Sequence, residues 1–558
     1  MIKKIANCFM NGEKSSRSIL NAAFLVASLG LVSRFLGLIR DRVLASKFGA
    51  GDTLDIYYAA FKIPDLIFNL LILGALSAAF IPVFTSLISN KKDEEAWNLV
   101  NKVISLAGLA LALVVTLLFI FAPTLVNLIA FGFDDEKRTA ITALTRIMLG
   151  SPLLLGFSSI LGGVLNSHKK FFFYSLAPVF YNVGIIIGAV FFVEIFGIPG
   201  LGYGVVLGAL LHLLVQIPEV FRCGLRFKPD FNFKDNHLKK VLVLMVPRTM
   251  GLAVVQINFL VVTILASTLD SGSLAIFSLA NNIQSVPLGL IGVSFAIVAF
   301  PTLSCSWAQN NKKEFVANFS DVFEKIIFFV IPTSIIFITL RAQLVRIILG
   351  AGRFDWNDTI LTFQALGIFS LSLFAQTLIP LLTRSFYAIH NTKTPFFIGL
   401  FSEAINLILA LVLIKKYGIY GLVWAFSIAA IINMFLLLII LQKKVGDLNE
   451  KSIIQKTWRV IMASMAMIIG IQTTKYLVAF ILETFNFSIL QYSINMYTLL
   501  GVLIQTGVSL IVGFILFYLA SKILKIEELD YFISLLRRKI FSFKRLAKYE
   551  NLESDNLK

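Results

Sequence analysis

The stretch LGLVSRFLGLIRDRVLASKFGAGDTLDIYYAAFKIPDLIFN, from Leu29 to Asn69, has the length and apolar content of two membrane-spanning helices joined by a short turn. Charged residues nevertheless interrupt both helices, among them Arg34, Arg40 and Lys62. A charged side chain is costly in hydrocarbon, so intramembrane charges face a bundle interior or a water-filled cavity. The stretch therefore predicts a helical membrane protein with a polar interior at its N-terminal hairpin.

The composition of the whole chain is that of an integral membrane protein. Its 558 residues are 58% hydrophobic and 14% charged, against roughly 45–50% and about 25% in soluble domains. Basic cytoplasmic loops explain the formal charge of +18. No basic stretch interleaves with aromatic residues as in a nucleic-acid-binding module, so we expect no nucleic-acid partner. The isolated cysteines and scattered histidines show no metal-ligand spacing.

Turn residues and charge clusters divide the chain into about fourteen predicted spans. We place them at residues 19–47, 54–89, 97–131, 138–167, 171–196, 200–222, 239–269, 273–308, 316–348, 358–389, 395–415, 419–442, 456–484 and 494–524. Basic loops alternate with short, charge-poor turns along the chain, and this asymmetry places both termini in the cytoplasm.

The chain also contains an internal repeat. The segment Leu54-Asp-Ile-Tyr-Tyr-Ala-Ala corresponds to Leu274-Ala-Ile-Phe-Ser-Leu-Ala, and a mid-helix proline follows in each copy, at Pro64 and Pro287. Further along, Asn182 corresponds to Asn406. Six spans fit within one copy, and an even number keeps the orientation, which predicts two parallel six-helix repeats of the kind found in secondary transporters. Chance similarity between apolar segments is the alternative.

The predicted fold is therefore an all-α polytopic membrane protein, with two repeats forming a V-shaped transporter and two extra C-terminal helices. Its predicted parts are a cytoplasmic segment (1–18), an N-lobe (19–222), a cytoplasmic linker (223–238), a C-lobe (239–442), two further helices (456–524) and a basic amphipathic tail (525–558). The tail alternates apolar and basic residues on a helical period, which suits an interfacial helix on anionic phospholipid.

The charged residues of the first hairpin fall on helical stripes. Ser33, Arg40 and Lys47 are spaced by seven, and Arg34 and Asp41 form the neighbouring stripe. In the second span the same spacing relates Asp55, Lys62 and Asn69.

Two interpretations of these stripes stay open. Ion pairs such as Arg40–Asp41 and Lys62–Asp65 would simply hold two helices together, with Arg34–Asp55 as a third. We favour a binding cavity, because the charges are concentrated in one hairpin and exceed what local pairing cancels. Arginine at membrane depth suits a phosphate or pyrophosphate, since its planar fork makes bidentate charge-assisted bonds.

Further candidates lie in the second half of the chain. Arg248, after Pro247, either reaches the cytoplasmic surface or faces the cavity. Gln256 and Asn258 with Glu403 and Asn406 could form an oxygen-rich cation site. A hydrogen-bonded Glu403 without an ion explains the same residues.

An enzyme receives little support from the sequence. The acidic cluster Asp134-Asp135-Glu136 could recruit a metal–pyrophosphate, but Lys137-Arg138 follows at once and favours a solvated turn. No Walker A motif is present, so we expect no ATP site.

Several motifs resemble the MurJ (MviN) family. They are Ser33-Arg-Phe-Leu-Gly-Leu-Ile-Arg-Asp41, Phe48-Gly-Ala-Gly, Asp55, Ala60-Phe-Lys-Ile-Pro64, Gly74-Ala-Leu-Ser-Ala-Ala-Phe-Ile-Pro82, Phe386-Tyr-Ala and Asn391-Thr-Lys-Thr-Pro395. The resemblance covers essentially the whole chain. It implies a flippase of the multidrug/oligosaccharidyl-lipid/polysaccharide (MOP) exporter superfamily, which carries the undecaprenyl-pyrophosphate-linked peptidoglycan precursor, lipid II, across the bacterial inner membrane by alternating access.

The resemblance also implies site residues and partners. The family uses the positions of Ser33, Arg34, Arg40, Asp41, Asp55 and Lys62 in its central cavity. We expect a transporter rather than an enzyme, with no cofactor and with energy from the membrane potential or a coupled Na⁺ or H⁺. Expected partners are lipid II, anionic phospholipid and the cell-wall synthesis machinery.

The sequence departs from the family pattern at three positions. Phe68-Asn69 stands where many members have arginine, Leu73 replaces a usual glutamate, and Asn282 occupies the place of an expected arginine. We expect Asn69 and Asn282 to line the cavity, and Arg248 to supply part of the missing positive charge. The alternatives are an exporter of another lipid-linked oligosaccharide, a MATE-like cation-coupled drug antiporter, and a polyprenyl-phosphate membrane enzyme.

Overall fold

The computed structural model describes residues 13–70, 72, 78–231, 235–484, 488–489, 492–493, 498–530 and 532–534. Side-chain environments are described for these residues except 13–24, 78–79, 236, 240, 242, 244, 246–255, 488–489 and 492–493. Most of the predicted N-terminal segment (1–18) and most of the predicted basic tail (525–558) therefore lie outside the described residues.

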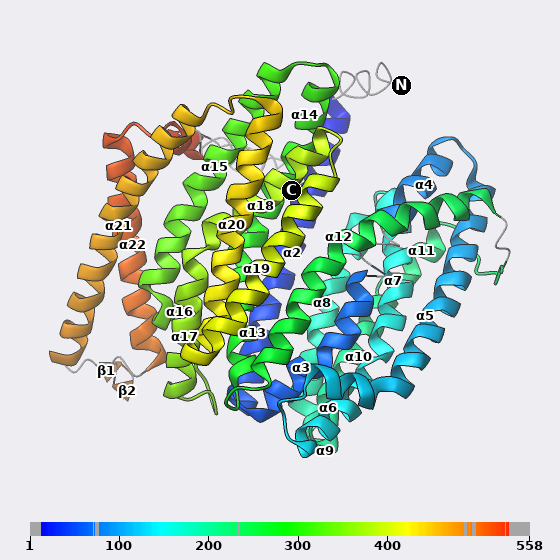
Figure 1. Cartoon of the computed structure of the whole chain (residues 1–558), viewed down its shortest axis with the longest axis horizontal. Helices are drawn as coiled ribbons and strands as arrows, with labels where there is room; N and C mark the ends of the chain where they lie inside the picture. Colours follow the sequence, from blue (N-terminus) through cyan, green and yellow to red (C-terminus); the bar gives the residue numbers. More distant parts are fainter. Residues whose placement is uncertain are drawn as a thin grey trace, which may run out of the picture. The chain divides into compact units, whose positions relative to one another are not determined.

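The described residues are almost entirely helical (Figure 1). In the first part of the chain the helices are α2 (Glu13–Phe48), α3 (Asp52–Ile67), α4 (Ala78–Ser89), α5 (Asp93–Ile129), α6 (Asp135–Met148), α7 (Gly150–Ser167), α8 (Phe171–Ile187), η2 (Gly188–Phe192), α9 (Val193–Phe196), α10 (Pro199–Leu214), α11 (Ile217–Arg222) and α12 (Asn236–Ala266). The remaining elements are α13 (Ser273–Pro287), η3 (Leu288–Val293), α14 (Ser294–Ala308), α15 (Lys312–Thr339), α16 (Arg341–Ile348), α17 (Trp356–Leu371), α18 (Leu373–Ala388), α19 (Lys393–Tyr417), α20 (Ile419–Val445), α21 (Glu450–Thr484), β1 (Ser488–Ile489), β2 (Tyr492–Ser493) and α22 (Leu499–Ile523). The two short strands pair antiparallel between α21 and α22.

In the described residues, ten helical spans are long and apolar enough to cross a membrane, or eleven if the bent pair α17 and α18 counts as one span. Some of these spans are single helices, and others join consecutive elements, such as α6 with α7. Three other predicted spans fall on α2, on α3 with α4, and on α12, which are not among these candidates. The helical membrane fold is confirmed, whereas the full count of about fourteen spans stays a prediction. Large apolar side chains such as Ile195 and Ile469, which are 71% and 66% exposed, suit contact with lipid.

The chain divides into two compact units. Unit 1 contains Met1–Asn282, Ile348–Thr362 and Glu403–Ala425; unit 2 contains Ile283–Ile347, Phe363–Ser402 and Phe426–Lys558. These boundaries do not follow the predicted linker at 223–238, because α12 belongs to unit 1 with the preceding helices. The assignment of two lobes and two repeats therefore stays a prediction. One local parallel between the proposed copies is visible, since Pro64 and Pro287 each precede a π-helical stretch, at residues 68–70 and in η3.

Unit 1 contains a close helix pair made by α8 with η2 against α10 (Figure 1). A Cβ atom added to Gly184 would lie 2.3 Å from the Gly208 Cα, and one added to Gly188 would lie 2.3 Å from the Gly204 Cα. Glycine spaced by four on both helices lets the two backbones touch, as small residues do in membrane helix pairs. This contact fixes how closely α8 lies against α10.

The first turn of α12 in unit 1 is held by the carboxylate of Asp235. Its Oδ1 accepts hydrogen bonds from the backbone N–H groups of His237 at 2.7 Å and Leu238 at 3.1 Å, and its Oδ2 lies 2.6 Å from the Lys102 Nζ. Partial burial raises the pKa of Asp235, but these hydrogen bonds and the ammonium outweigh it and hold the pKa below its ordinary value. The linker before α12 is thereby tied to α5.

Unit 2 is built around α15, which packs against α14, α18 and α21. Aromatic side chains, including Phe315, Phe319 and Phe386, fill its core. α21 and α22 form an adjacent helical pair (Figure 1), and Met467 and Phe517 belong to a second buried cluster that also includes Phe328 of α15.

Candidate functional site

Unit 1 contains a cavity of about 520 Å³ that collects the polar residues of the first hairpin. The predicted site residues that line it are Arg40, Asp41, Lys62, Asn69, Gln256 and Asn282. They come from α2, from α3 and the π-helical stretch after it, and from α12 and α13. Helices α7, α8 and α10 supply other parts of the wall.

An Arg40–Asp41 ion pair forms the centre of the polar network. The Asp41 Oδ1 accepts hydrogen bonds from the Arg40 Nε at 3.0 Å and Nη2 at 2.8 Å. The Asn282 Nδ2 donates to the Asp41 Oδ2 at 3.0 Å, and the Arg40 Nη1 donates to the Asn182 Oδ1 at 3.1 Å. The side chain of Asp41 is 2% exposed and that of Arg40 is 22% exposed. The predicted Arg40–Asp41 pair is present, and it lies in the cavity wall.

The stripe predicted on α2 faces α8 and the segment that follows it. The Asn182 Nδ2 donates to the backbone oxygen of Ser33 at 3.4 Å, and a Cβ on Gly37 would lie 3.9 Å from the Asn182 Oδ1. At the far end of the stripe, the Lys47 Nζ donates to the Val190 oxygen at 2.9 Å. Ser33 thus contributes its backbone at this position, and helical spacing by seven identified the contact face.

Asn182 is a cavity-network residue that the sequence analysis did not select as a site residue. Its only signal was its correspondence with Asn406 in the proposed repeat. In the structure both asparagines are buried and both join polar clusters of unit 1.

Lys62 presents a charged group to the cavity. Its Nζ lies 5.3 Å from the centre of the Phe259 ring, a cation–π contact. The predicted Lys62–Asp65 ion pair is not formed within the described part of the chain, although both side chains line the cavity. Asn69, one turn further, donates from Nδ2 to the Asp65 backbone oxygen at 2.9 Å.

The described cavity lining carries no net formal charge, whereas an excess of positive charge was expected. Among the described lining residues, Arg40 and Lys62 are basic, and Asp41 and Asp65 are acidic. Two charges of each sign therefore balance, because Phe68 and Asn282 stand where arginines were expected. Arg248 lies on α12, and its side chain is outside those that the structure describes.

Asp55 has a structural position away from the cavity lining. Its Oδ2 accepts a hydrogen bond from the Gly272 N–H at 2.7 Å and its Oδ1 accepts one from the Ala275 N–H at 2.8 Å. Both carboxylate oxygens thus satisfy free backbone donors at the start of α13. Asp55 was expected to line the cavity, and it instead ties α3 to the turn before α13. Arg34 is exposed on α2 and is not among the lining residues.

The predicted cation-site residues form a cluster of three rather than four. The Asn406 Nδ2 donates to the Asn258 Oδ1 at 3.0 Å and lies 3.4 Å from the Glu403 Oε2. Asn258 and Asn406 are buried in unit 1. Gln256 lines the cavity instead. The cluster offers one carboxylate and two amide oxygens, which suits a hydrogen-bonded Glu403 as well as a small cation.

The acidic cluster after α5 stabilises the start of a helix. Asp134 Oδ1 accepts a hydrogen bond from the Lys137 N–H at 2.8 Å, and Asp135 pairs with Arg138. No group of three or more His, Cys, Asp or Glu side chains is placed to hold a metal ion in the described ranges. These contacts fit a helix N-cap.

Comparisons with known proteins agree on one family. The family model described as "Lipid II flippase MurJ" matches residues 44–498. A protein of Thermotoga maritima named "Probable lipid II flippase MurJ" is 30% identical over 515 residues, covering 92% of this chain and 98% of the relative. One of Rickettsia prowazekii with the same name is 32% identical over 432 residues, covering 75% and 83%.

Solved structures show the same relationship. The structure titled "Lipid II flippase MurJ, inward closed conformation" has a TM-score of 0.72 at 28% identity, covering 90% of this chain and 99% of that one. An inward-facing multidrug resistance MATE transporter of the MOP superfamily has a TM-score of 0.63 at 16% identity, covering 77% and 99%, and this likeness concerns the fold alone. The match to the family model extends over most of the sequence, from the end of α2 to the start of α22. The chain belongs to the MurJ family.

Proposed function

We propose that this multi-pass membrane protein is a flippase that moves lipid II from the cytoplasmic to the outer leaflet of the bacterial inner membrane. Family membership supports the substrate, because the relatives are named for lipid II. The helical membrane fold and the polar cavity in unit 1 support transport rather than chemistry on the lipid.

The observation that carries the proposal is that the wall of one polar cavity contains both a basic residue and a tyrosine. The Lys62 Nζ contacts a phenyl ring, and its ammonium has no ion pair within the described residues. The Tyr58 Oη is buried, lines the same cavity and has no hydrogen-bond partner among the described residues. An ammonium and a phenol can both donate to a phosphate oxygen, so they suit a pyrophosphate headgroup.

Arg40 would join this headgroup by exchanging partners. A pyrophosphate oxygen competes with the Asp41 carboxylate for the Arg40 guanidinium, since both are oxygen anions that accept bidentate hydrogen bonds. Asp41 also accepts from Asn282, so a weakened Arg40–Asp41 pair changes the link between α2 and α13. Binding the headgroup would thus favour a different arrangement of the two helices, as alternating access requires.

Energy coupling, orientation and further partners belong to the same proposal. The Asn258, Glu403 and Asn406 cluster is the candidate site for a coupled Na⁺ or H⁺, with the membrane potential as the alternative source. Basic loops favour cytoplasmic termini and contact with anionic phospholipid. The cell-wall synthesis machinery is the expected consumer of the transported lipid.

A cellular lipid II accessibility assay tests the proposal. Cells depleted of their own flippase receive the wild type, Lys62→Ala, or the control Lys169→Ala, whose lysine lies in an exposed turn. We expect the wild type and Lys169→Ala to restore surface-exposed lipid II, and Lys62→Ala to lose most of this activity at equal membrane insertion. A correctly inserted wild type that leaves lipid II inside rejects the flippase function. Full activity of Lys62→Ala rejects the role assigned to this lysine.

A further inference from the structure

Unit 2 contains a second cavity, of about 460 Å³, that the proposed flippase function does not use. Its walls are α14, α15 and the segment that follows α22. The lining residues that matter here are Phe295 and Val298 on α14, Asp321, Lys325 and Phe329 on α15, and Glu528 in the C-terminal segment. Its volume falls within the usual range for small-ligand sites.

The lining of this cavity changes from polar to aromatic along the helices. Asp321 and Lys325 lie in the half of α15 that begins with the basic residues Lys312-Lys313, whereas Phe329 lies about 12 Å further along the helix than Asp321. The Phe329 ring is 6.0 Å from that of Phe295 and 5.4 Å from that of Phe532. One end of the cavity therefore suits a charged headgroup and the other end suits an acyl chain.

The charges at the polar end are predominantly acidic. Asp321 lies 2.6 Å from the Lys325 Nζ. Behind the cavity wall, the Lys456 Nζ is surrounded by three carboxylates: Glu324 at 2.9 Å, Glu527 at 3.2 Å and Glu528 at 3.6 Å. Four carboxylates thus surround two lysines in a chain whose overall charge is +18. This local excess disfavours a purely anionic ligand.

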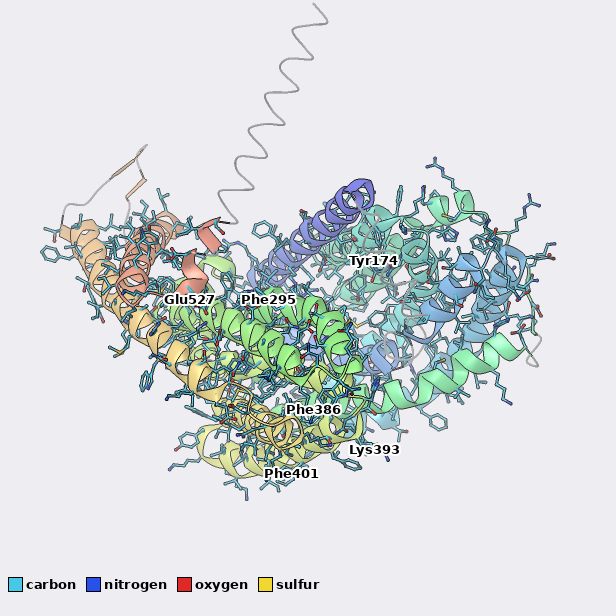
Figure 2. All side chains as sticks on the ribbon, turned by 90° about the horizontal axis from the view of Figure 1, so that it is seen from above. Tyr174, Phe295, Phe386, Lys393, Phe401 and Glu527 are labelled. Atoms are coloured by element: carbon cyan, nitrogen blue, oxygen red, sulfur yellow. The ribbon has the colours of Figure 1, made fainter. Side chains whose placement is uncertain are left out.

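We propose that this cavity binds one zwitterionic phospholipid with a primary ammonium, of the phosphatidylethanolamine class. The ammonium lies toward Asp321 and Glu528, and the Lys325 ammonium faces the phosphate. An acyl chain follows Phe295 and Phe329 and leaves past Val298, which is 75% exposed. Figure 2 labels Phe295 on α14 and Glu527 in the C-terminal segment; the cavity residue Glu528 follows Glu527 in the sequence.

The alternative occupants differ in charge or in size. Phosphatidylglycerol has the same chains and phosphate but no ammonium, so it forfeits the attraction of Asp321 and Glu528. A polyprenyl diphosphate carries more negative charge and no ammonium. Charge complementarity at the polar end therefore selects the aminophospholipid.

Native mass spectrometry of the purified full chain tests this assignment. The protein is titrated with phosphatidylethanolamine or with phosphatidylglycerol of identical acyl chains, and the tightly retained lipid is counted. Val298→Trp places a large ring at the cavity, and the control Ile297→Trp changes the neighbouring residue, which is 51% exposed and does not line it. We expect one retained phosphatidylethanolamine in the wild type and in Ile297→Trp, and its loss in Val298→Trp.

A charge variant tests the selectivity. Asp321→Asn should reduce the preference for phosphatidylethanolamine over phosphatidylglycerol by about two- to fivefold, the factor that one partly exposed ion pair supplies. Glu314→Gln on the same helix is the matched control, since Glu314 is exposed and not at the cavity. Equal retention of both lipids, or equal retention by the two tryptophan variants, overturns the proposal. Displacement of the bound lipid by a polyprenyl diphosphate also overturns it, and assigns the cavity to a polyprenyl lipid.

Discussion

The Arg40–Asp41 pair allows a quantitative test of the cavity network. Asp41→Ala removes two charge-assisted hydrogen bonds to the guanidinium and the acceptor of the Asn282 amide. Deleting one partner of a buried pair costs about 3–5 kcal/mol, because the other charge stays buried. The Arg40 side chain is 22% exposed and keeps its hydrogen bond to Asn182, so we expect a loss near the lower limit, about 3 kcal/mol.

The double variant gives the sharper outcome. Arg40→Ala in the Asp41→Ala background removes the orphaned charge, so the double variant should be more stable than Asp41→Ala by about 1–2 kcal/mol. Reversible unfolding in mixed micelles of sodium dodecyl sulfate and a mild detergent, followed by tryptophan fluorescence, measures all four corners of the cycle. The exposed pair Lys92–Glu95, with side chains 54% and 46% exposed, is the control and should show little coupling, because solvent screens it. If the two single losses at Arg40 and Asp41 simply add, the pair is not the stabilising unit described here.

Three further perturbations follow from backbone and cap geometry. Gly272→Ala should prevent correct folding, because the φ of Gly272 is +87° and an added Cβ would lie 1.8 Å from a backbone oxygen. Gly446→Ala, at φ +106° with nothing within 4 Å, should lower the free energy of unfolding by only about 1–2 kcal/mol. Thermal unfolding in detergent compares the two variants. Asp235→Ala should lower the unfolding midpoint, because it removes a helix cap worth about 1 kcal/mol. In the wild type the pKa of Asp235 lies below 3.8, so the carboxylate stabilises the fold above that pH and loses this effect as the pH falls through the lowered pKa. A series of unfolding midpoints at different pH values measures this loss. Gly208→Leu should abolish stable expression, whereas Gly507→Leu, which has open space around it, should express normally by fluorescence-detected size exclusion.

Each of these comparisons has an outcome that contradicts its premise. Equal stability of the two alanine variants would mean that the turn before α13 adapts to a side chain. A wild-type advantage over Asp235→Ala that persists unchanged well below pH 3.8 would show that the carboxylate charge is not what stabilises α12. Normal expression of Gly208→Leu would mean that α8 and α10 can separate without loss of the fold.

Local periodicity predicted the parts of the site that lie on one helix. Spacing by seven placed Ser33, Arg40 and Lys47 on one face, and the structure shows that face against α8 and its continuation. The Arg40–Asp41 contact needed only sequence neighbours. The helical membrane fold followed from apolar content and window length, because hydrocarbon leaves few other ways to satisfy backbone polar groups.

Periodicity could not predict the partner that a side chain meets across space. Asp55 shares the seven-residue spacing of Lys62 and Asn69, yet it lies in the first turn of α3, where backbone N–H groups near α13 compete for its carboxylate. The partner of Arg40 on α8, Asn182, has an ordinary polar side chain within an apolar helix. Only the fold brings these distant segments together, so neither contact has a local sequence signature.

The glycine contact between α8 and α10 determines which surfaces can rearrange during a transport cycle. Where backbones touch without intervening side chains, no rotamer change can accommodate a shift, so the two helices travel as a single rigid body. Asn182 and Tyr181 belong to α8 and would move with this helix pair. A Cβ added to Gly208 would lie 2.5 Å from the backbone oxygen of Tyr181. The opposite side of α8 with η2 is held instead by side-chain hydrogen bonds to the Ser33, Arg40 and Lys47 positions of α2, which can break and re-form. Residues with no side chain thus hold α8 and α10 together, and the charged stripe of α2 is a contact of this helix pair that side chains can adjust.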